Sequence, residues 1–490
     1  MPVQSLPSNP SFENLRKQAK TLRRAVQVRE PAALAQVREF HPHPTEVSKA
    51  FPLGDAQLVV ARGYGFSSWA KLKQQLKAIS EYSWAPLKHA NDNAPNIVDQ
   101  FIDLACLTYG GDHTTRHDKA RELFAANPSL SSANIYAAAT VGDVSGVTTM
   151  LEQNASLATR RGGPRHWEPL LYTTYSRLNS TEPKHSTLEV ARLLLEHGAD
   201  PNAGFLWEGH YLFTALTGVF GEGESGPRHQ PQHQYCSQLA RMLLTAGADP
   251  NDSQTLYNRM FTGRTDHLEL LFEFGLGKEG KSVWSKRLGN QDASSEMLQQ
   301  QLGWAAKYNQ MARMQLLVEH GVDVNVADSR LQRTPYELAV LNGNRKIAQY
   351  LLDQGAREVS LDDVDDFFSA CLGADSVRAR ALLAKDKTLT ERLGSDRVEL
   401  LHLAAERDKA DAIRLMANLG FDLNERKRTT ALHHAAMSGN VEMAKLLIEL
   451  GADPSIRDTE FNATPLGWAE YGEKKEAAEF LKQFEPRTME

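Results

Sequence analysis

The chain has 490 residues, of which 41% are hydrophobic and 24% charged, and this composition excludes a wholly disordered protein. Its 55 Lys and Arg residues stand against 61 Asp and Glu residues, a formal net charge of −6, which argues against a protein held mainly by nucleic-acid phosphates. Three widely separated cysteines, Cys106, Cys236 and Cys371, predict neither a disulfide framework nor a zinc site.

The first residues and the hydropathy of the chain help to predict where in the cell the protein is located. The first residues, MPVQSLPSNPSF, lack the basic and apolar regions of a secretory signal. No stretch approaches 18 consecutive apolar residues, the length from which a membrane-spanning helix is expected. Together with the cysteine usage, these features predict a cytoplasmic protein with no membrane span.

A helical module is expected over residues 11–79. Apolar residues follow helical spacing in SFENLRKQAKTLRRAV, a second helix is expected in AALAQVREF, and a third runs from DAQLVVARGYG through SWAKLKQQLKAI. Before this module we expect a disordered tail at residues 1–10. After it, residues 80–96, SEYSWAPLKHANDNAPN, are expected to form a linker.

The first helix of this module is strongly basic, with Arg16, Lys17, Lys20, Arg23 and Arg24. One interpretation is an arm that binds nucleic acid or an anionic membrane surface. The interpretation we favour is a solvated helix face on a cap over the following region. Five charges in an acidic chain make a poor nucleic-acid binder, so nucleic acid is not an expected partner.

Residues 97–484 contain an internal repeat. A Gly-Ala-Asp tripeptide or a close variant recurs at Gly198, Gly247, Gly321, Gly355, Gly420 and Gly451. The step is 34 residues from Gly321 to Gly355 and 31 residues from Gly420 to Gly451, so the period is near 33. Each glycine follows an apolar helical stretch, where it suits the left-handed turn that ends a helix.

A second signature precedes the glycine by about twenty residues. It reads TALHHAA at Thr430, TPLGWAE at Thr464, TPYELAV at Thr334 and LLHLAAE at Leu400. Thr caps a helix, Pro is tolerated at its first position, and Ala lets neighbouring helices approach closely. Each unit is therefore expected to be a turn, a helix, a short turn and a second helix.

The TPLHxA-like strings and the Gly-Ala-Asp turns resemble the ankyrin repeat. The resemblance covers residues 97–484 and implies an all-α solenoid of about ten or eleven helix-turn-helix repeats with a long curved surface. The preceding module, with its AR-x-YGF-x-SW string, is similar to leader modules placed before bacterial ankyrin arrays. The expected architecture is thus a small helical module followed by an ankyrin-repeat array.

Three insertions interrupt the period, near residues 109–117, 176–187 and 221–236. The distance from the Thr-Pro-like position to the glycine is 20 residues for Pro335 to Gly355, but 29 for Pro169 to Gly198 and 32 for Ala215 to Gly247. Equivalent turns of stacked repeats project from one edge, and insertions gathered there often bind a partner.

These insertions are rich in histidine, which suggests two hypotheses, a metal site and a site of acid–base catalysis. The candidate metal ligands are His113, His117, His229 and His233, in two pairs with i, i+4 spacing. The candidates for acid–base catalysis are His210, His229 and His233. Because no catalytic motif is present and GEGESG at Gly221 follows a helix rather than a strand, we favour polar loop residues, no metal and no cofactor.

Aromatic residues gather in the middle repeats. The resemblance implies that first helices and turns line a concave docking surface, on which Tyr, Trp and Arg would form a binding hot spot. The candidate binding residues are Trp167, Tyr172, Trp207, Glu208, Tyr211, Tyr257 and Arg259. The alternative is that several of them belong to the core, as expected above all for Phe213 and Trp304.

Two functions follow from these observations. The first is a scaffold that binds an unidentified protein partner through the concave face and inserted loops of its middle repeats, on the analogy of the family. The second is an enzyme or small-ligand binder, with a pocket formed by the inserted loops and the His-, Trp- and Tyr-rich residues 166–235. We favour the first, and a small-molecule ligand stays open.

Overall fold

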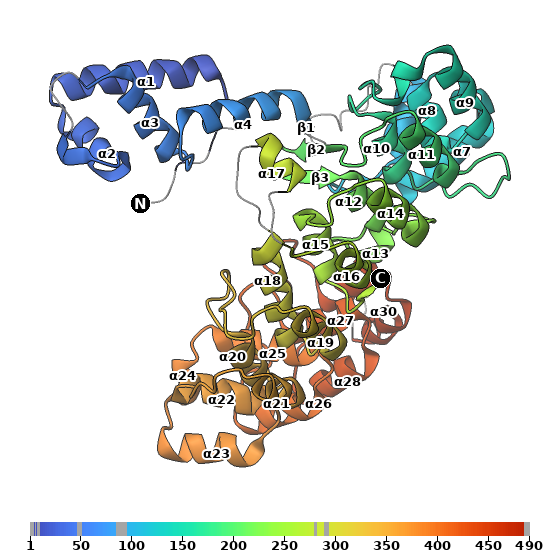
Figure 1. Cartoon of the computed structure of the whole chain (residues 1–490). Helices are drawn as coiled ribbons and strands as arrows, with labels where there is room; N and C mark the ends of the chain where they lie inside the picture. Colours follow the sequence, from blue (N-terminus) through green and yellow to red (C-terminus); the bar gives the residue numbers. More distant parts are fainter. Residues whose placement is uncertain are drawn as a thin grey trace. The chain divides into compact units, whose positions relative to one another are not determined.

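The computed structural model describes most of the chain: Gln4, Leu6 and residues 10–46, 51–84, 96–278, 282–288 and 294–484. The described chain is mostly helical and includes a small three-stranded sheet (Figure 1). It divides into two compact units, Met1–Gln301 and Leu302–Glu490, whose boundary falls within helix α18 (Ser294–Lys307). Most of the expected tail and of the expected linker lies outside the described residues.

The N-terminal module consists of helices. Its elements are α1 (Phe12–Gln27), α2 (Pro31–Phe40), the short 3-10 helix η1 (Pro44–Glu46), α3 (Leu53–Gly63) and α4 (Trp69–Tyr82). The single third helix expected from the sequence is wrong, because α3 and α4 are separate. Gly65 adopts a left-handed φ of 83°, and the Ser68 side chain then caps α4 by accepting from Lys71 N at 3.3 Å.

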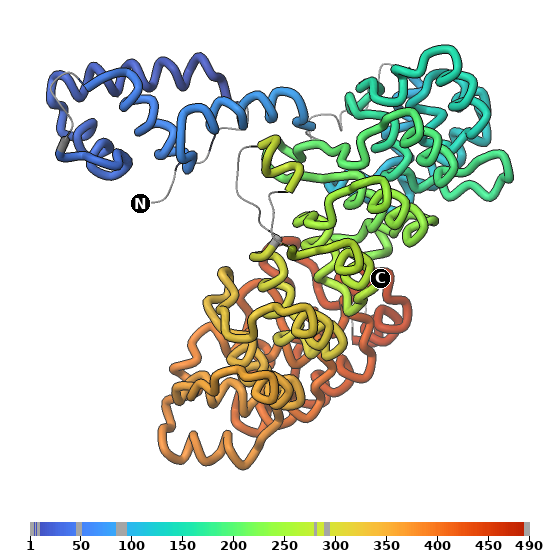
Figure 2. Tube along the Cα trace, viewed as in Figure 1, coloured from blue at the N-terminus to red at the C-terminus, as the bar shows by residue number. Residues whose placement is uncertain are grey.

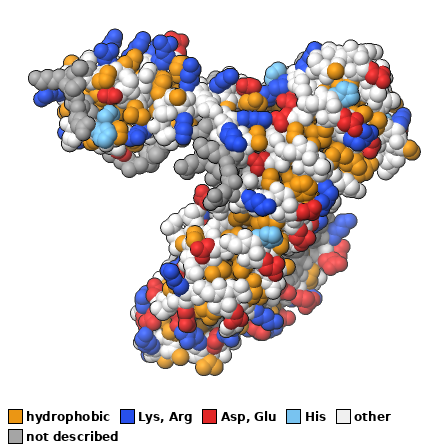
Figure 3. Space-filling model, viewed as in Figure 1, with side chains coloured by type: hydrophobic (Ala, Val, Ile, Leu, Met, Phe, Trp, Pro, Cys, Tyr) orange, Lys and Arg blue, Asp and Glu red, His pale blue; other side chains and the backbone are white. Residues whose placement is uncertain are grey.

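Helix α1 buries one face and exposes the other. The Ser11 side chain caps it, and Leu15, Ala19, Leu22 and Val26 form its buried stripe. The five basic side chains predicted on this helix are all exposed, and Lys and Arg side chains gather over the module in Figure 3. This arrangement fits the interpretation of a solvated helix face.

The rest of the first unit consists mainly of helical pairs joined by turns. Its helices are α6 (Ile97–Ala105), α7 (Thr114–Ala126), η2 (Pro128–Ser132), α8 (Ile135–Val141), α9 (Val144–Gln153), η3 (Ala155–Ala158), α10 (Pro169–Tyr175), α11 (Thr187–Glu196), α12 (Ala215–Phe220), α13 (Gly226–His229), α14 (Cys236–Thr245), α15 (Ser253–Met260), α16 (Asp266–Glu273) and α17 (Val283–Leu288). The first helices of successive pairs pack on one another, as α8 packs on α10 and α10 on α12.

The second unit has the same plan. After the end of α18 come α19 (Met311–Glu319), α20 (Pro335–Leu341), α21 (Arg345–Asp353), α22 (Asp363–Leu372), α23 (Ser376–Lys385), α24 (Leu389–Arg392), α25 (Asp396–Glu406), α26 (Ala410–Asn418), α27 (Ala431–Ser438), α28 (Val441–Glu449), α29 (Pro465–Tyr471) and α30 (Lys475–Lys482). The path of these helical hairpins can be followed in Figure 2. The number of repeats stays a prediction.

The repeat signatures act as their chemistry predicts. Thr334 caps α20 in a reciprocal capping box with Glu337, and the Thr464 side chain accepts from Gly467 N at 3.3 Å to cap α29. Gly198 and Gly451 adopt left-handed φ values of 87° and 104° after α11 and α28. Each helical pair therefore begins and ends through local interactions encoded in its own sequence.

In several repeats an asparagine four residues after the turn glycine ties the repeat to the next. Asn424 donates from Nδ2 to Gly451 O at 3.1 Å and accepts from Asp453 N at 2.7 Å. Asn325 makes the same pair of bonds with Gly355 O and Arg357 N. The sequence analysis did not use this signal, although the spacing is visible in Gly-Phe-Asp-Leu-Asn and Gly-Val-Asp-Val-Asn.

The sheet corrects the expectation of an all-α fold. Strand β1 (Ser83–Trp84) pairs in parallel with β2 (Gly204–Trp207), which forms an antiparallel hairpin with β3 (Tyr211–Thr214). The segments GFLW and YLFT are rich in aromatic residues, which favour strands. Between them, Glu208 and Gly209 both adopt left-handed φ values, 52° and 77°, which turn the chain back on itself.

The N-terminal module docks on later parts of the same unit through α4. Ala78 and Ile79 pack with Leu206, Trp284 and Leu288, which come from β2 and α17. Gln74 Nε2 also donates to the carbonyl oxygens of Lys286 at 2.6 Å and Arg287 at 2.9 Å. The module and the repeat region of the first unit thus share an apolar cluster.

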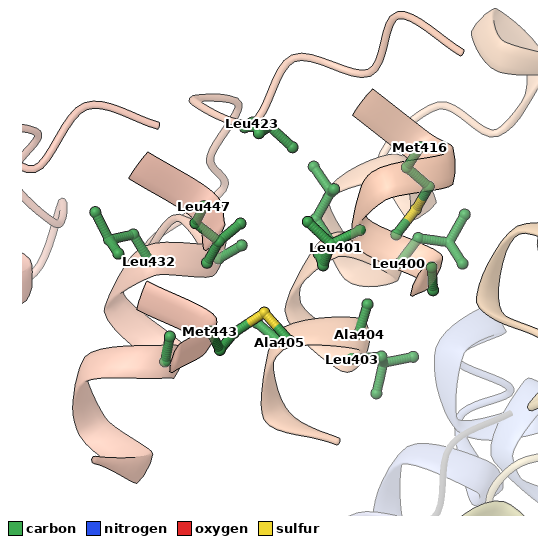
Figure 4. Packing of buried hydrophobic residues seen from close by; sticks show 14 of the residues in the cluster. Leu400, Leu401, Leu403, Ala404, Ala405, Met416, Leu423, Leu432, Met443 and Leu447 are labelled. Carbon is green, nitrogen blue, oxygen red and sulfur yellow. The ribbon is translucent and has the colours of Figure 1, made fainter. Parts of the chain in front are cut away.

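The second unit has its own hydrophobic core. The cluster runs from Phe367 in α22 to Leu481 in α30 and includes side chains from both helices of each pair. Figure 4 shows Leu401 of α25 and Leu447 of α28 within it, between neighbouring helical pairs. Small Ala residues on the first helices, such as Ala404 and Ala435, are fully buried and allow close packing of successive pairs.

Candidate functional site

A cleft of about 200 Å³ lies beside the β2–β3 hairpin in the first unit. It is lined by residues of the hairpin, of the turn at residues 248–254 and of α17. His210 and Tyr211 contribute to it from the hairpin, and Asp252 and Trp284 contribute from the other two segments. The hairpin therefore presents a hollowed, mixed polar and aromatic surface.

Buried polar contacts hold the base of the hairpin. The Asp252 carboxylate is buried and accepts hydrogen bonds from Thr214 Oγ1, from Thr217 Oγ1 at 3.2 Å and from Thr255 N at 2.9 Å. Desolvation raises the pKa of Asp252, although these donors oppose the rise. Because its oxygens are already engaged, Asp252 shapes the cleft and offers no free carboxylate to a ligand.

Asn202 also lines the cleft, and it is the counterpart of the asparagines that tie repeats together. Asn202 Nδ2 donates to Gly247 O at 2.9 Å, and its Oδ1 accepts from Asp249 N at 2.8 Å. Trp284 Nε1 donates to Asn202 O at 2.9 Å. The aromatic wall of the cleft is thus anchored directly to the turn between two repeats.

Four of the residues singled out in the sequence meet at the hairpin. Tyr211 is 59% exposed, and its ring centroid lies 6.2 Å from that of Trp207. Trp207 is half-buried, and its Nε1 donates to Thr108 O, just before the first insertion, at 2.9 Å. Glu208 and His210 occupy the turn itself. The hairpin therefore carries a small exposed aromatic and charged surface.

The other predicted binding residues lie elsewhere. Trp167 is fully buried and stacks on Phe205 with ring centroids 4.4 Å apart. Tyr172 is also buried, and its hydroxyl donates to Gly162 O at 2.7 Å. Tyr257 is half-buried on α15, and its hydroxyl donates to Glu224 Oε1. Trp167 and Tyr172 therefore support the hairpin from within and do not form its exposed surface.

Arg259 belongs to a buried ion-pair network. Its guanidinium is fully buried and pairs with the buried carboxylate of Glu222 and with Asp266, the latter at 2.6 Å. The candidate binding residue Arg259 therefore lies within the fold and not on an exposed surface, because Glu222 of the third insertion pairs with its guanidinium. The pair fixes the insertion at residues 221–235 against α15 and α16.

The first and third insertions also contact each other. Asp112 accepts from Thr108 N at 2.9 Å and from Arg116 Nη1 at 2.7 Å, and Gln230 Nε2 reaches it at 3.4 Å. Buried Arg177, from the second insertion, donates to Pro231 O at 2.7 Å. The insertions are thus ordered parts of the fold with internal polar contacts.

The histidines of the insertions are only partly brought together. His113 and His229 come from different insertions, and their ring centroids lie 5.0 Å apart. His117 is buried in α7, where desolvation lowers its pKa to about 4. His233 is buried beside Thr187 Oγ1 at 3.1 Å, and desolvation holds its pKa well below the usual value.

These positions bear on the metal and acid–base alternatives. Within the described ranges, no group of three or more His, Cys, Asp or Glu side chains is placed to hold a metal ion. The three candidates for acid–base catalysis are distributed over the exposed turn at His210, the short helix at His229 and the buried loop at His233.

The part of the chain with described structure has no helix long and apolar enough to span a membrane.

One titratable residue was missed by the sequence analysis. Glu168 precedes the first residue of α10, and its Oε2 is buried without a hydrogen-bond partner among the described residues. Desolvation, together with the nearby charge of Asp200, raises its pKa to about 7. The only sequence signal was a carboxylate next to Pro169 at a helix start, where Ser or Thr is the usual cap.

Comparison with known proteins adds an independent observation. A family model described as "Ankyrin repeats (3 copies)" matches residues 263–363 and 370–458. The β2–β3 hairpin precedes these residues, in the segment where insertions interrupt the period, whereas α17, which also lines the cleft, falls within the first matched range. The similarity is therefore clearest in and near the second unit.

Several curated proteins share part of the chain. The ankyrin repeat and KH domain-containing protein mask-1 of Caenorhabditis elegans is 29% identical over 32% of this chain. The ankyrin repeat and SOCS box protein 6 of Homo sapiens is 40% identical over 14%, and the human mitochondrial disaggregase is 29% identical over 39%. The chain covers 6%, 16% and 26% of the lengths of these three proteins, respectively.

These relatives differ in their named functions, and each shares only a minor part of its length with this chain. Two of the three are named as ankyrin repeat proteins. The family model matches a region in which Thr caps, left-handed glycines and helical pairs recur. The chain contains ankyrin repeats.

Proposed function

We propose that the chain is a protein-binding scaffold whose first unit engages a partner through the tip of the β2–β3 hairpin and the adjacent insertions. Ankyrin repeats are generally protein-interaction modules, which supports the class of function. The observation that carries the location is the exposed Tyr211 beside half-buried Trp207, at the mouth of a cleft. Tyr and Trp supply large contact area at a low cost in side-chain entropy.

The rigidity of the hairpin supports this location. Buried contacts fix both of its sides, through Asp252 at its base and through the stack of Trp167 on Phe205 behind it. A surface held in place before binding loses less conformational entropy when a partner docks. The proposed partner surface is therefore the hairpin tip, with Trp207, Glu208, His210 and Tyr211.

The proposal is tested by quantitative affinity capture with the full chain. We expect Tyr211→Ala to weaken binding of its main partner at least tenfold, which corresponds to about 1.4 kcal/mol. Tyr471→Ala is the matched control, since Tyr471 is also an exposed tyrosine, 85% exposed, but lies on α29 of the second unit. A partner that binds wild type and Tyr211→Ala equally well would contradict the proposed surface.

The enzyme or small-ligand alternative is not favoured by any observation. The Asp252 carboxylate at the cleft is engaged by three donors, and the candidate histidines do not share one site. The cleft, at about 200 Å³, is smaller than the pockets that typically enclose a drug-sized ligand, roughly 300–1,000 Å³. We therefore propose protein binding alone.

A further inference from the structure

Basic side chains from two distant segments meet around one tyrosine ring in the second unit. The Lys307 ammonium lies 5.5 Å from the centre of the Tyr308 ring, and the Arg407 guanidinium carbon lies 4.9 Å from it. Trp304 stacks on the same ring with centroids 4.2 Å apart. We define the basic cluster as Trp304, Lys307, Tyr308, Arg407 and Lys409.

The cluster is assembled at the C-terminal ends of three helices. Lys307 ends α18, and Arg407 follows α25 directly. Arg407 Nη1 donates to Asn342 Oδ1 at 2.9 Å, and Lys409 Nζ donates to Asn342 O at 3.1 Å, both just beyond α20. Cations stabilise helix C-termini, so part of the arrangement has a structural explanation.

Stabilisation of helix ends does not account for all the hydrogen-bond donors and positive charge of the basic cluster. Nε and Nη2 of Arg407 are shielded from water and have no hydrogen-bond acceptor among the described residues. Lys307, Arg407 and Lys409 form no ion pair with any carboxylate of the described chain. The nearest carboxylates acting on them are Glu399 and Glu406, and Glu406 Oε1 is already bonded to His434 Nδ1 at 2.6 Å.

The electrostatic environment reflects this imbalance. Burial, and then the neighbouring Arg407 charge, lowers the pKa of Lys409 to about 8. Burial and the same neighbour lower the pKa of Lys307, while Glu399 and Glu406 oppose this shift only in part. Partly desolvated cations without counter-charges are costly, and an incoming anion would relieve that cost.

We propose that the basic cluster binds an acidic segment of a partner protein, with a side-chain carboxylate between Lys307, Arg407 and Lys409. Trp304 and Tyr308 offer a flat aromatic surface beside the charges. A peptide that carries a carboxylate can pack on this surface, whereas a free ion cannot use it. The proposal rests on the proposed function in that it names a class of partner, although it concerns a different unit of the chain.

A peptide fits the surroundings better than a dianion. Glu399 and Glu406 act on the cluster and would oppose a strongly charged phosphate more than a single carboxylate. Beyond Glu406, polar and aromatic side chains continue in contact, since the His434 ring stacks on His402 at 4.2 Å and lies 6.4 Å from Trp468. An extended segment would meet this series, whereas a small anion would use the cluster alone.

The test uses the full chain and a fluorescein-labelled twelve-residue peptide with six glutamates, alongside a counterpart in which glutamine replaces each glutamate. We expect the glutamate peptide alone to bind. Lys409→Gln and Lys307→Gln should each weaken its binding at least fivefold. Lys346→Gln is the matched control, because Lys346 is an exposed lysine of α21 in the same unit, and should change affinity less than twofold.

Three outcomes would overturn the proposal: equal binding of both peptides, unchanged affinity in both cluster variants, or displacement of the peptide by inorganic phosphate at constant ionic strength. Lys307→Gln keeps the test valid if Lys409→Gln fails to fold, since Lys409 Nζ donates to Asn342 O, whereas the Lys307 ammonium makes no hydrogen bond to the described residues. Tyr211→Ala should bind the glutamate peptide normally, so failure here and failure of the hairpin surface are distinguishable.

Discussion

Glu168 shows how one buried carboxyl couples the fold to pH. Its folded pKa of about 7 lies above the ordinary value of 4.5, because burial and Asp200 disfavour its charged form. A group with a raised folded pKa contributes stability that is fully present below its unfolded pKa and is lost as pH rises through the folded pKa. The folded state is therefore penalised by this group at pH 8 and not at pH 4.

We expect Glu168→Gln to raise the free energy of unfolding at pH 8 by up to about 3 kcal/mol, at 1.36 kcal/mol per pKa unit, and to leave it nearly unchanged at pH 4. Urea unfolding at the two pH values measures the difference. Glu122→Gln is the control, since Glu122 is an exposed carboxylate of α7. Equal stabilisation at both pH values would show that ionisation of Glu168 is not the cause.

Whether the role of a single residue could be predicted from the sequence depends on how local its contacts are. Thr334 and Gly451 were identified correctly because a cap and a left-handed turn depend on neighbours within a few positions. For Trp167 and Arg259 the sequence left a binding surface and the core open, and both are buried. Their environments are set by Phe205 and Glu222, 38 and 37 residues away, and by an insertion whose course no periodicity describes.

At the scale of elements, the asparagines after the turn glycines are as important as the helices they connect. Asn202, Asn325 and Asn424 each donate to the turn glycine of the next repeat and accept from a backbone N–H just beyond it. Each such side chain satisfies two backbone groups that a turn would otherwise leave to water. The bonds join neighbouring repeats independently of the apolar core.

We expect Asn424→Ala to lower the free energy of unfolding by about 1–2 kcal/mol, because two hydrogen bonds to the backbone are lost. Thermal unfolding followed by circular dichroism would measure the loss. Lys427→Ala lies in the same turn region on an exposed side chain and should leave stability within about 0.5 kcal/mol of wild type. If the two variants were equally stable, the asparagine would be only a surface residue.

The elements differ in how far sequence could predict them. Helical pairs follow from the period and from local caps, and they are present where the signatures stand. The β2–β3 hairpin was not predicted, because GFLW and YLFT fall at the position where a regular repeat has only a turn. The hairpin carries four of the candidate site residues, which the sequence singled out by their composition alone.

At the scale of the whole molecule, the second unit contains a large hydrophobic core of its own. The cluster of buried residues from Phe367 to Leu481 lies entirely within it. In repeat proteins stability is approximately a sum over repeats and the interfaces between neighbours. A fragment with enough consecutive repeats therefore retains most of its stabilising contacts.

We expect the fragment 294–490, which keeps α18 whole, to be helical and to unfold cooperatively, as measured by circular dichroism and calorimetry. The fragment 302–490 cuts α18 within its length and should be less stable, because the helix that carries Trp304 loses its first turns. An unfolded 294–490 fragment would show that the second unit depends on contacts outside itself.

The docking of α4 has a consequence for synthesis on the ribosome. Ile79 packs with Leu206, Trp284 and Leu288, so the residues that complete the cover of this apolar face are translated more than two hundred positions later. At roughly 5–20 residues per second, the delay is on the order of ten to forty seconds. During that interval α4 exposes its apolar side to other nascent chains and chaperones. A polypeptide truncated before α17 lacks Trp284 and Leu288. It never completes the cover of the apolar side of α4 and is therefore prone to aggregate.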